Sequence, residues 1–415
     1  IMSSNDSEIT VSDAVLKAVD KLVKDEGYVS YSLKIAPGSK KGDNYVGVVY
    51  KLTINCTKKD GKTEQKHIMC KVPPANAARR EQFQSRPCFI REVLVYKNIL
   101  PQLLQFQQQI NPKITFDAYA KCLAAGDVDM NEFVLMEDLS LQDFLMFDRH
   151  QKLDLNHVAL VMQELGKFHA LSFAMKDQKP EEFKKLSNIN DVFFESFVND
   201  YFNMYISSII DKVVAAMDED DKCKAKMEQF KDFTSMGKDL TDFKNAEPYA
   251  VINHGDCWNN NMLFRYIEGK PYELRLLDWQ IARYASPVLD LMYYIFCCTQ
   301  ETLRARHYET FMHIYHGSLS DFLRKLGSDP EKLFPYSALQ DQLKRFGKFG
   351  LLLSLTILQA LIVNAEDVPD MDEVAENLKK DPEKMNLSMY ENPCEAEFNR
   401  RILAIVHDMD KLGYI

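Results

Sequence analysis

One stretch, residues 249–280, constrains the fold of this 415-residue chain more than any other. Short apolar runs alternate in it with polar turns, a pattern that predicts short strands joined by tight connections. The runs are Tyr249–Ile252, Met262–Phe264 and Leu274–Leu277. Asp256 follows the first run, Asn261 precedes the second and Asp278 ends the third. We therefore expect a small β structure that presents these three polar side chains at one edge.

The spacing of these polar residues matches the needs of phosphoryl transfer. One carboxylate must orient an attacking hydroxyl or accept its proton, while another carboxylate and an amide oxygen hold Mg²⁺ against nucleotide phosphates. The pattern HxDxxxxN with a later Asp supplies these groups, so we predict Asp256 as the catalytic residue and Asn261 and Asp278 as metal ligands. ATP and Mg²⁺ are the expected cofactors. For each residue alone, the capping of a turn is the alternative.

A lysine and a glutamate earlier in the chain complete this prediction. Residues 66–72 read as a strand in which Lys71 faces away from Ile68, where its ammonium group could reach ATP phosphates. Residues 87–100 read as a helix with Glu92 on the apolar stripe, and a buried carboxylate needs a partner. We therefore predict an ion pair between Lys71 and Glu92. A surface lysine and a glutamate at the edge of the stripe are the alternatives.

The segments HGDCWNNNMLF (254–264) and LLDWQ (276–280) resemble the ecdysteroid-kinase-like family, also called the CHK-kinase-like family. Its members are insect-rich relatives of choline kinases and aminoglycoside phosphotransferases, and the resemblance covers nearly the whole chain. It implies an α+β, bilobal, protein-kinase-like fold. Residues 1–138 would form a small, β-rich, nucleotide-binding lobe. Residues 139–415 would form a larger, mainly helical lobe for catalysis and acceptor binding.

The resemblance also implies two nucleotide contacts in the first lobe. Gly42, Asp43 and Asn44 resemble the GDN-containing nucleotide loop of the family, in which backbone N–H groups approach phosphates. The strand predicted at residues 132–136 would lead to the hinge between the lobes. There, the backbone around Met136, Glu137 and Asp138 would meet the adenine edge. A plain hairpin turn and a strand ending in a polar turn are the respective alternatives.

Weaker signals concern the supports of the site. In related kinases, an Asp in the position of Asp290 ties down the catalytic loop, and His169 is expected to buttress the same loop from a long helix. Residues 177–247 read as two or three helices, with a dense aromatic stripe between Phe193 and Tyr205. That stripe is either core or a wall of the acceptor site. The polar segment 366–393 reads as a loop.

Composition excludes several classes of function. The net charge is −10 and the chain has no dense basic block, which argues against nucleic acid as a partner. The longest apolar stretch, residues 349–363, is shorter than the roughly 20 residues that a membrane helix needs. The nine cysteines form no CxxC pattern and the first residues do not resemble a signal segment. We expect a cytoplasmic protein with reduced thiols and no membrane insertion.

The resemblance implies a small hydroxylated acceptor: an ecdysteroid or another lipophilic compound such as a plant toxin. Inactivation of a hormone or detoxification of a xenobiotic, in an insect, would be its role. Choline- or ethanolamine-kinase-like activity and a non-catalytic pseudokinase are the alternatives. The metal motif reads Asp-Trp-Gln instead of Asp-Phe-Gly, and no activation segment follows it. Protein substrates are therefore not expected.

Overall fold

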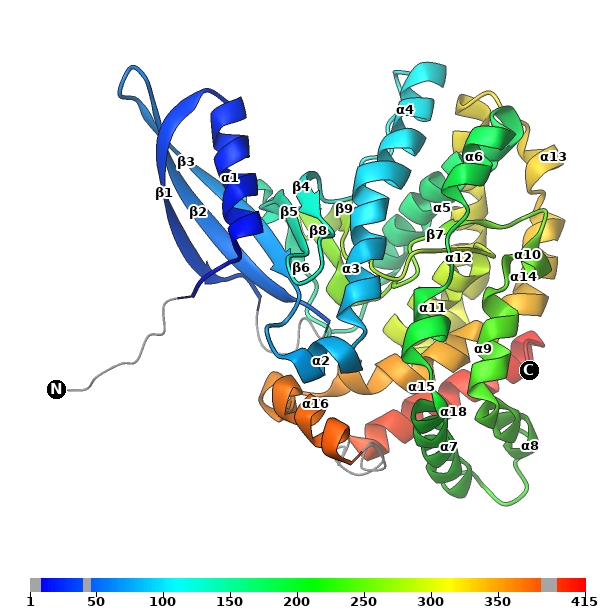
Figure 1. Cartoon of the computed structure of the whole chain (residues 1–415). Helices are drawn as coiled ribbons and strands as arrows, with labels where there is room; N and C mark the ends of the chain where they lie inside the picture. Colours follow the sequence, from blue (N-terminus) through cyan, green and yellow to red (C-terminus); the bar gives the residue numbers. More distant parts are fainter. Residues whose placement is uncertain (1–8, 40–45, 382–393) are drawn as a thin grey trace.

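A computed structural model describes residues 9–39, 46–381 and 394–415 of the chain. The molecule is bilobal: a twisted sheet with one covering helix forms the small lobe, and a larger helical lobe lies beside it (Figure 1). This arrangement confirms the predicted α+β class. The predicted nucleotide loop, Gly42 to Asn44, lies outside the described residues.

The small lobe is built on a five-stranded antiparallel sheet with the order β1-β2-β3-β5-β4. Helix α1 (Asp13–Asp25) begins where the Ser12 side chain accepts a bond from the Val15 N–H, and its apolar stripe covers one face of the sheet. The strands are β1 (Tyr28–Pro37), β2 (Val48–Lys58), β3 (Thr63–Val72), β4 (Cys122–Gly126) and β5 (Phe133–Glu137). The opposite face of the sheet is therefore the one that can meet the other lobe.

The register of β3 follows the sequence prediction. The β2–β3 hairpin closes at Gly61, whose φ of +81° suits a residue without a side chain. Ile68 and Cys70 pack in the small core beneath α1. Because successive side chains of a strand point to opposite faces, Lys71 lies on the face away from α1, where it is 3% exposed.

The helix predicted at residues 87–100 is longer than expected. It consists of α3 (Ser85–Leu94), a π-helical turn (Val95–Ile99) and α4 (Leu100–Ile110). The prediction ended the helix at residue 100. A proline inside a helix removes an N–H donor, and its ring clashes with the preceding turn. The wider π-helical turn lies immediately before Pro101 and lets the helix continue through it. α3 and α4 thereby form one continuous helical rod, called the α3 rod below (Figure 1).

The large lobe is a helical assembly around one extensive apolar core. Helix α5 packs along α12, while α15 packs against both α11 and α18. The longer helices are α5 (Leu155–Gln178), α11 (Val288–Cys298), α12 (Glu301–Lys325), α14 (Tyr336–Phe346), α15 (Phe349–Ile362) and α18 (Glu395–Leu412); α13 (Pro330–Leu333) is short. The large core also takes in Val93 and Tyr96 from the α3 rod and Met136 from β5. We propose the domain boundary near residue 139. The apolar core of the large lobe continues across this boundary into the small lobe.

The region from residue 177 to 247 contains more and shorter helices than predicted. They are α6 (Pro180–Leu186), a π-helical turn (Phe193–Phe197), α7 (Asp200–Ala215), α8 (Lys224–Glu228), α9 (Phe233–Thr241) and α10 (Phe243–Ala246). The side chains of Asn199 and Asp242 accept backbone N–H bonds and start new helices where periodicity alone suggested continuation. The segment predicted as a loop at 366–393 also differs, because Asp370 caps α16 (Met371–Lys380).

Two small sheets lie beside the helices of the large lobe. Strands β6 (Leu145–Met146), β8 (Met262–Ile267) and β9 (Lys270–Leu276) form one, and β7 (Val251–Asn253) pairs with β10 (Arg283–Ala285) in the other. The strands predicted around the constraining stretch are therefore confirmed. They hold residues 254–261 and the segment after Leu276 next to each other, since the N–H of Leu277 donates to the carbonyl of Asn261 at 2.9 Å.

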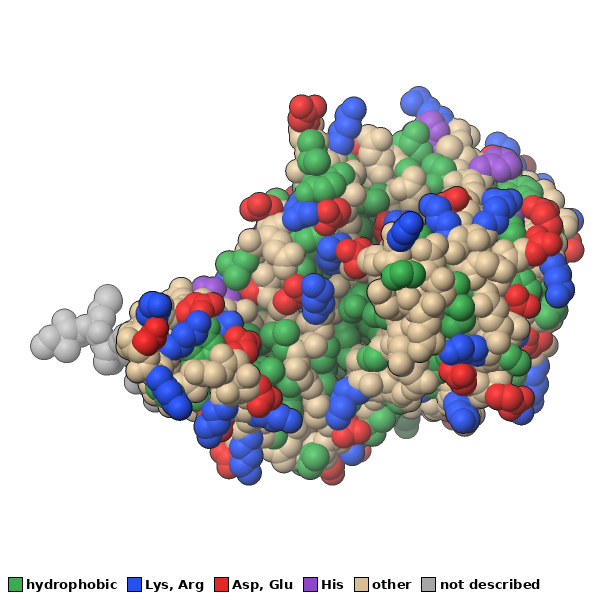
Figure 2. All heavy atoms as spheres, turned by 90° about the horizontal axis from the view of Figure 1, so that it is seen from above, with side chains coloured by type: hydrophobic (Ala, Val, Ile, Leu, Met, Phe, Trp, Pro, Cys, Tyr) green, Lys and Arg blue, Asp and Glu red, His purple; other side chains and the backbone are tan. Residues whose placement is uncertain are grey.

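Charged side chains of both signs are mixed on the surface. Lys and Arg side chains are interspersed with Asp and Glu over the face seen from above (Figure 2). Across the described residues, no single helix combines the length and apolarity needed to cross a membrane. The pair Pro330–Phe346 and Phe349–Ile362 meets that test only when joined, and it is bent by 59°.

Candidate active site

The loop that carries Asp256 is held by close backbone packing. Gly255 has a φ of +89°, and a Cβ added there would lie 2.2 Å from the carbonyl oxygen of Ile281. Only glycine fits this approach. His254 accepts a bond from the Asp256 N–H at 3.2 Å with Nδ1, and its Nε2 lies 2.9 Å from the Leu277 carbonyl oxygen as the donor. The loop that carries Asp256 is thereby connected to the segment that leads into Asp278.

Asp290 supports this loop from the first turn of α11. Its two carboxylate oxygens accept bonds from the backbone N–H groups of His254 at 2.7 Å and Gly255 at 2.9 Å. His169 of α5 contacts the same carboxylate at 3.2 Å and Tyr315 at 2.9 Å. Burial raises the pKa of Asp290, but the bonds and charge from His169 and the loop outweigh it and lower the pKa. The supporting contacts predicted for Asp290 and His169 are confirmed.

The side chain of Asp256 is buried and hydrogen-bonded, and the residue is 8% exposed. Its Oδ2 accepts a bond from Asn261 Nδ2 at 2.8 Å, and its Oδ1 accepts one from the Tyr293 hydroxyl at 2.8 Å. Burial raises the pKa of Asp256 to about 6, the negative charge of Asp278 adds to the rise, and the two hydrogen bonds oppose it. A carboxylate with a pKa near neutrality is suited to take a proton.

The amide of Asn261 is oriented by Asp256. Its Nδ2 donates both to the Asp256 backbone oxygen at 3.1 Å and to the Asp256 carboxylate. Because the nitrogen is engaged on that side, the amide oxygen is the atom that remains available to a cation. Together with the carboxylate of Asp278, it forms the oxygen donor set that Mg²⁺ prefers, so these residues fit a magnesium ion.

Asp278 follows β9 in a left-handed backbone conformation, with a φ of +65°. Its Oδ1 accepts a bond from Lys71 Nζ at 2.6 Å. The next residue, Trp279, is fully buried, and its ring centroid lies 4.5 Å from that of His254 and 5.2 Å from that of Phe168. This aromatic anchor holds Asp278 in place while its side chain reaches toward the small lobe.

Lys71 joins the two lobes. Its Nζ also donates to Glu92 Oε2 at 2.8 Å, so the predicted Lys71–Glu92 ion pair is confirmed. Burial lowers the pKa of Lys71, but the charges of Asp278 and Glu92 outweigh it, and the pKa lies above its ordinary value. Burial raises the pKa of Glu92, and the Lys71 ammonium opposes that rise. Lys71 is therefore a fixed positive charge between two carboxylates.

A polar network behind Glu92 was missed by the sequence analysis. Arg91, 5% exposed, donates to the Asn190 carbonyl at 2.8 Å, to Asn190 Oδ1 at 2.6 Å and to the Ala282 carbonyl. Arg283, also buried, pairs with Asp191 at 2.7 Å. These bonds connect α3 to residues 190–191 and to the segment after Asp278. The position of Glu92 is thereby tied to both.

A small apolar cluster lies next to the charged groups. Cys88, Val192 and Ile281 form its buried part, and Val46, Phe193 and Phe197 pack against it. Burial raises the pKa of the Cys88 thiol, and the charges of Asp278 and Lys71 also act on it, so this cluster adjoins the Lys71–Asp278 pair. The aromatic stripe predicted at residues 193–205 therefore contributes both to core packing and to an apolar wall near the site.

The side chains of the residues predicted at the hinge make more hydrogen bonds and ion pairs than the sequence suggested. Met136 is buried, and its sulfur accepts a bond from the Tyr96 hydroxyl at 3.5 Å. The Glu137 carboxylate accepts bonds from the Lys121 N–H and the Gln142 amide, both at 2.9 Å. Asp138 pairs with Lys51 at 2.7 Å. With their side chains so occupied, these residues could offer a nucleotide mainly main-chain groups, and adenine contact stays a prediction.

Gly47 belongs to the described residues and follows the predicted nucleotide loop closely in the chain. A Cβ added to it would lie 3.2 Å from Lys71 Cε, so the chain after the loop runs close to the lysine stem. Ser85 Oγ of α3 donates to the Val46 carbonyl at 3.0 Å and ties the same stretch to the rod that carries Glu92. Contacts from Gly42, Asp43 and Asn44 to phosphate remain a prediction.

The structure thus brings together Lys71 and Glu92 from the small lobe with Asp256, Asn261 and Asp278 from the large lobe. Trp258, 4% exposed, belongs to the large core. Tyr293 is the functional neighbour that the sequence analysis overlooked. It lies three residues after Asp290 on α11, so helical periodicity could have placed it on the same face.

Comparison with known families supports the arrangement. Residues 41–328, more than half of the chain, match the model of the ecdysteroid kinase-like family. None of the curated proteins has a matching sequence.

Solved structures with a similar arrangement are distant. Plasmodium vivax ethanolamine kinase is 13% identical with a TM-score of 0.40, and the match covers 91% of each chain. The GDP and kanamycin complex of APH(2")-IIia is 13% identical with a TM-score of 0.41, covering 90% of this chain and 99% of that one. The GDP complex of wild-type aminoglycoside 2'-phosphotransferase-IIIa is 11% identical with a TM-score of 0.41, covering 91% and 100%. Likeness of this degree carries no information on the substrate.

Proposed function

Because this chain belongs to the ecdysteroid kinase-like family, a family of small-molecule kinases, we propose that it transfers the γ-phosphate of ATP to a hydroxyl group of a small lipophilic compound. Ecdysteroids and hydroxylated plant toxins are the proposed acceptors, with hormone inactivation or detoxification as the role. The thiols of Cys56, Cys70, Cys88, Cys122, Cys223, Cys257, Cys297 and Cys298 are free, which accords with the reducing cytoplasm proposed as the location of the protein.

The observation that carries this proposal is the bridge from Lys71 to Asp278 across the two lobes, at 2.6 Å. Asp278 also stands close enough to Asp256 for its charge to raise the pKa of that carboxyl. A site with a buried cation, two carboxylates and an oriented amide suits the charged phosphates of a nucleotide. A pseudokinase would have no use for the complete set, which disfavours that alternative.

Magnesium would be held by Asn261 and Asp278, whose oxygens form its preferred donor set. When bound, the ion would neutralise charge on the nucleotide phosphates. The remaining roles belong to the chain itself. Lys71, held by Glu92, orients the phosphates through its ammonium group, and Asp290 keeps the loop that carries Asp256 in place.

Asp256 is proposed as the group that orients the acceptor hydroxyl. As the hydroxyl oxygen forms its bond to the γ-phosphorus, the bond from phosphorus to the bridging oxygen of ADP breaks and Asp256 takes the hydroxyl proton. The bonds from Tyr293 and Asn261 hold the carboxylate in one orientation. Its pKa of about 6 leaves it mostly ionised at pH 7 and able to accept that proton.

The apolar cluster beside the site supports a lipophilic acceptor. Phe193 and Phe197, from the π-helical turn, pack against a cluster that contains Val192 and Ile281. Ile281 follows Asp278 closely in the chain, so the cluster adjoins the segment that carries this carboxylate. A flat, mostly hydrocarbon compound would bury apolar surface there while a hydroxyl met Asp256. We propose these two phenylalanines as walls of the acceptor site.

The test is a screen for ATP consumption with purified protein and Mg²⁺ over ecdysteroids, plant phenolics and alkaloids, and choline. The proposal expects turnover with one of the lipophilic hydroxylated compounds. Turnover with choline alone would replace it with the choline-kinase-like alternative. Binding of nucleotide without any turnover would favour the pseudokinase.

The first variant to test is Asp256→Ala. We expect its kcat to fall by about 10²–10⁴-fold, because the group that takes the proton is lost, while nucleotide binding is retained. Asp25→Asn, a change at an exposed carboxylate on α1, is the matched control and should keep full turnover. If Asp256→Ala turned over at the unaltered rate, the role assigned to Asp256 would be wrong.

A further inference from the structure

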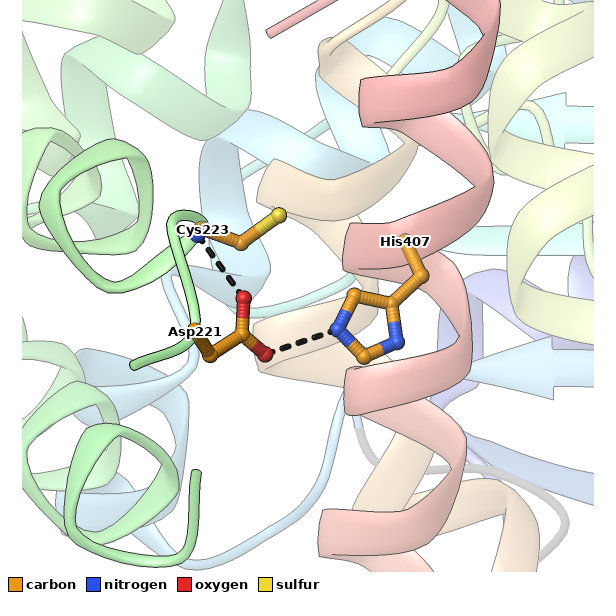
Figure 3. A group of neighbouring side chains, drawn as sticks. All are labelled: Asp221, Cys223 and His407. Atoms are coloured by element: carbon orange, nitrogen blue, oxygen red, sulfur yellow. Dashed lines mark hydrogen bonds and ion pairs between the residues drawn. The ribbon is translucent and has the colours of Figure 1, made fainter. Parts of the chain in front are cut away.

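A second cluster of reactive side chains lies far along the chain from the proposed catalytic residues. Asp221 and Cys223 come from the turn between α7 and α8, and His407 comes from α18 (Figure 3). Their ligand atoms all lie within 4.8 Å of one another. Within the described parts of the chain, this is the one set of three His, Cys, Asp or Glu side chains that meets that distance.

The geometry of the cluster is partly fixed by hydrogen bonds. The Cys223 N–H donates to Asp221 Oδ1 at 2.8 Å, which folds the turn around the carboxylate. The other oxygen, Oδ2, lies 2.9 Å from His407 Nε2. Cys223 is 1% exposed, whereas the His407 side chain is 55% exposed. The site is therefore closed on the sulfur side and open to solvent on the imidazole side.

Neighbouring charges leave the cluster its own negative charge. Lys222 and Lys226 both pair with Asp410, one turn after His407 on α18, with Lys222 at 2.9 Å. Lys226 also donates to the carbonyl of Ile415 at 2.8 Å. Both lysines thus pair with a carboxylate outside the cluster, which matches one of their two positive charges. Asp221 faces the imidazole and the Cys223 backbone and sulfur.

We propose that Asp221, Cys223 and His407 bind a Zn²⁺ ion that joins the α7–α8 turn to α18. Thiolate, imidazole and carboxylate are the zinc ligands of proteins, and sulfur disfavours Mg²⁺ and Ca²⁺. Tetrahedral Zn²⁺ with its usual bond lengths sets ligand atoms roughly 3.3–3.6 Å apart. The Asp221–His407 pair needs to open slightly and the Cys223 sulfur to approach by at most about 1.5 Å, within the reach of a side-chain rotation.

Binding has a definite chemical balance. The Cys223 thiol loses its proton to solvent, and the imidazole proton moves from Nε2 to Nδ1 through solvent, so that Nε2 leaves its hydrogen bond to Asp221 and can coordinate the metal. Water would occupy the fourth position on the exposed side. Since Lys222, Lys226 and the last residue already hold the end of α18, the ion would reinforce an existing connection between α18 and the region that begins at α7.

The experiment uses Co²⁺ as a visible probe of the Zn²⁺ site in the full chain after removal of metals by a chelator. We expect one equivalent of Co²⁺ to give the charge-transfer absorption of a cobalt–thiolate bond, and one equivalent of Zn²⁺ to remove it. Cys223→Ser should abolish that band. His407→Gln, a change at an exposed position, should weaken Co²⁺ binding by at least about tenfold because one ligand is lost.

Cys394→Ser, which removes a half-buried cysteine outside the cluster, is the matched control and should retain the band. Zn²⁺ should also raise the unfolding midpoint of the wild-type chain, and at the same concentration it should raise that of His407→Gln by less. A cobalt–thiolate band that persists in Cys223→Ser, or no band in the wild-type chain, would overturn the proposal and leave an ordinary ion pair between Asp221 and His407.

Discussion

At Asp256, burial and hydrogen bonding act against each other on one carboxyl group. Burial and the charge of Asp278 raise its pKa to about 6, while the bonds from Tyr293 and Asn261 limit the rise. The folded-state pKa is above the ordinary value of 3.8, so the folded chain binds this proton more tightly than the unfolded chain. The contribution of Asp256 to stability therefore decreases as the pH rises from about 4 to 6. A residue placed at such a cost to stability is typical of a functional site.

This pKa predicts a pH dependence of turnover. The carboxylate must be ionised to accept the hydroxyl proton, so kcat/KM should fall about tenfold per pH unit below a midpoint near 6. Initial rates at subsaturating acceptor between pH 5 and 8 measure this limb. A rate that stays constant down to pH 5 would contradict the assignment of Asp256 as the base.

Replacement of Tyr293 by phenylalanine should move that midpoint. The Tyr293 hydroxyl donates to the ionised carboxylate, so its loss removes a stabilising bond and raises the pKa of Asp256. We expect the midpoint in kcat/KM to shift upward by roughly one pH unit, with activity largely recovered at higher pH. Tyr294→Phe is the matched control, because the neighbouring hydroxyl makes no hydrogen bond within the described residues. Identical pH profiles in both variants would show that Tyr293 is not coupled to Asp256.

At the scale of elements, α3 has two polar functions on neighbouring residues. Glu92 faces Lys71, and Arg91 holds the rod against Asn190 and the Ala282 carbonyl. The guanidinium group suits this place, since its fork reaches several acceptors at once and lysine cannot. The rod that positions Glu92 is therefore secured to the segment that follows Asp278 and to the residues that lead into the π-helical turn.

Arg91→Lys should test this connection. With the fork lost, we expect a loss of about 2–4 kcal/mol in the free energy of unfolding and a lower kcat, since Glu92 and Lys71 would be held less firmly. Denaturant unfolding and steady-state kinetics measure both effects. Arg86→Lys on the same helix is the control, because Arg86 is partly exposed and pairs with Glu132 away from the site. Unaltered kcat in Arg91→Lys would limit the role of Arg91 to stability.

Elements with strong local patterns were predictable, and contacts between distant segments were not. The alternation in β3 placed Lys71 on the correct face, and the apolar stripe of residues 156–175 predicted most of α5. Asp256 and Asn261 were recognisable because both belong to one loop. By contrast, Arg91 and Asn190 are far apart in the chain, and nothing local marks either as the partner of the other. Between residues 180 and 246, α7 and α10 begin at individual capping side chains, a signal that periodicity averages out.

At the scale of the whole molecule, the proposed nucleotide site draws on both lobes, so a bound nucleotide should stabilise the entire chain. Mg-ATP at a hundred times its dissociation constant should add about 2.7 kcal/mol to the free energy of unfolding. Differential scanning fluorimetry measures this as a higher unfolding midpoint. EDTA should remove most of the shift, because Asn261 and Asp278 act through the metal, and Lys71→Met should do the same.

Lys58→Met, at a partly exposed lysine of β2, is the control for the loss of a positive charge. An equal shift with and without EDTA would show that Asn261 and Asp278 do not bind a metal together with the nucleotide.

The two lobes also contact each other away from the proposed nucleotide site. Helix α16, from near the end of the chain, packs on α2 (Ala77–Gln82) of the small lobe, with Arg79 and Asp372 paired at 3.3 Å.

The burial of Trp279 has a consequence for how such an enzyme would be controlled in a cell. A protein kinase that is regulated in this way becomes inactive when the segment with its metal-binding aspartate moves out of the active site. A small residue next to the aspartate gives the backbone the freedom for that movement. Here a large indole is wedged between His254 and Phe168 directly after Asp278, so withdrawal would require part of the interior to come apart. We expect a catalyst that is permanently switched on, whose output is governed by how much of it is synthesised and how much acceptor arrives.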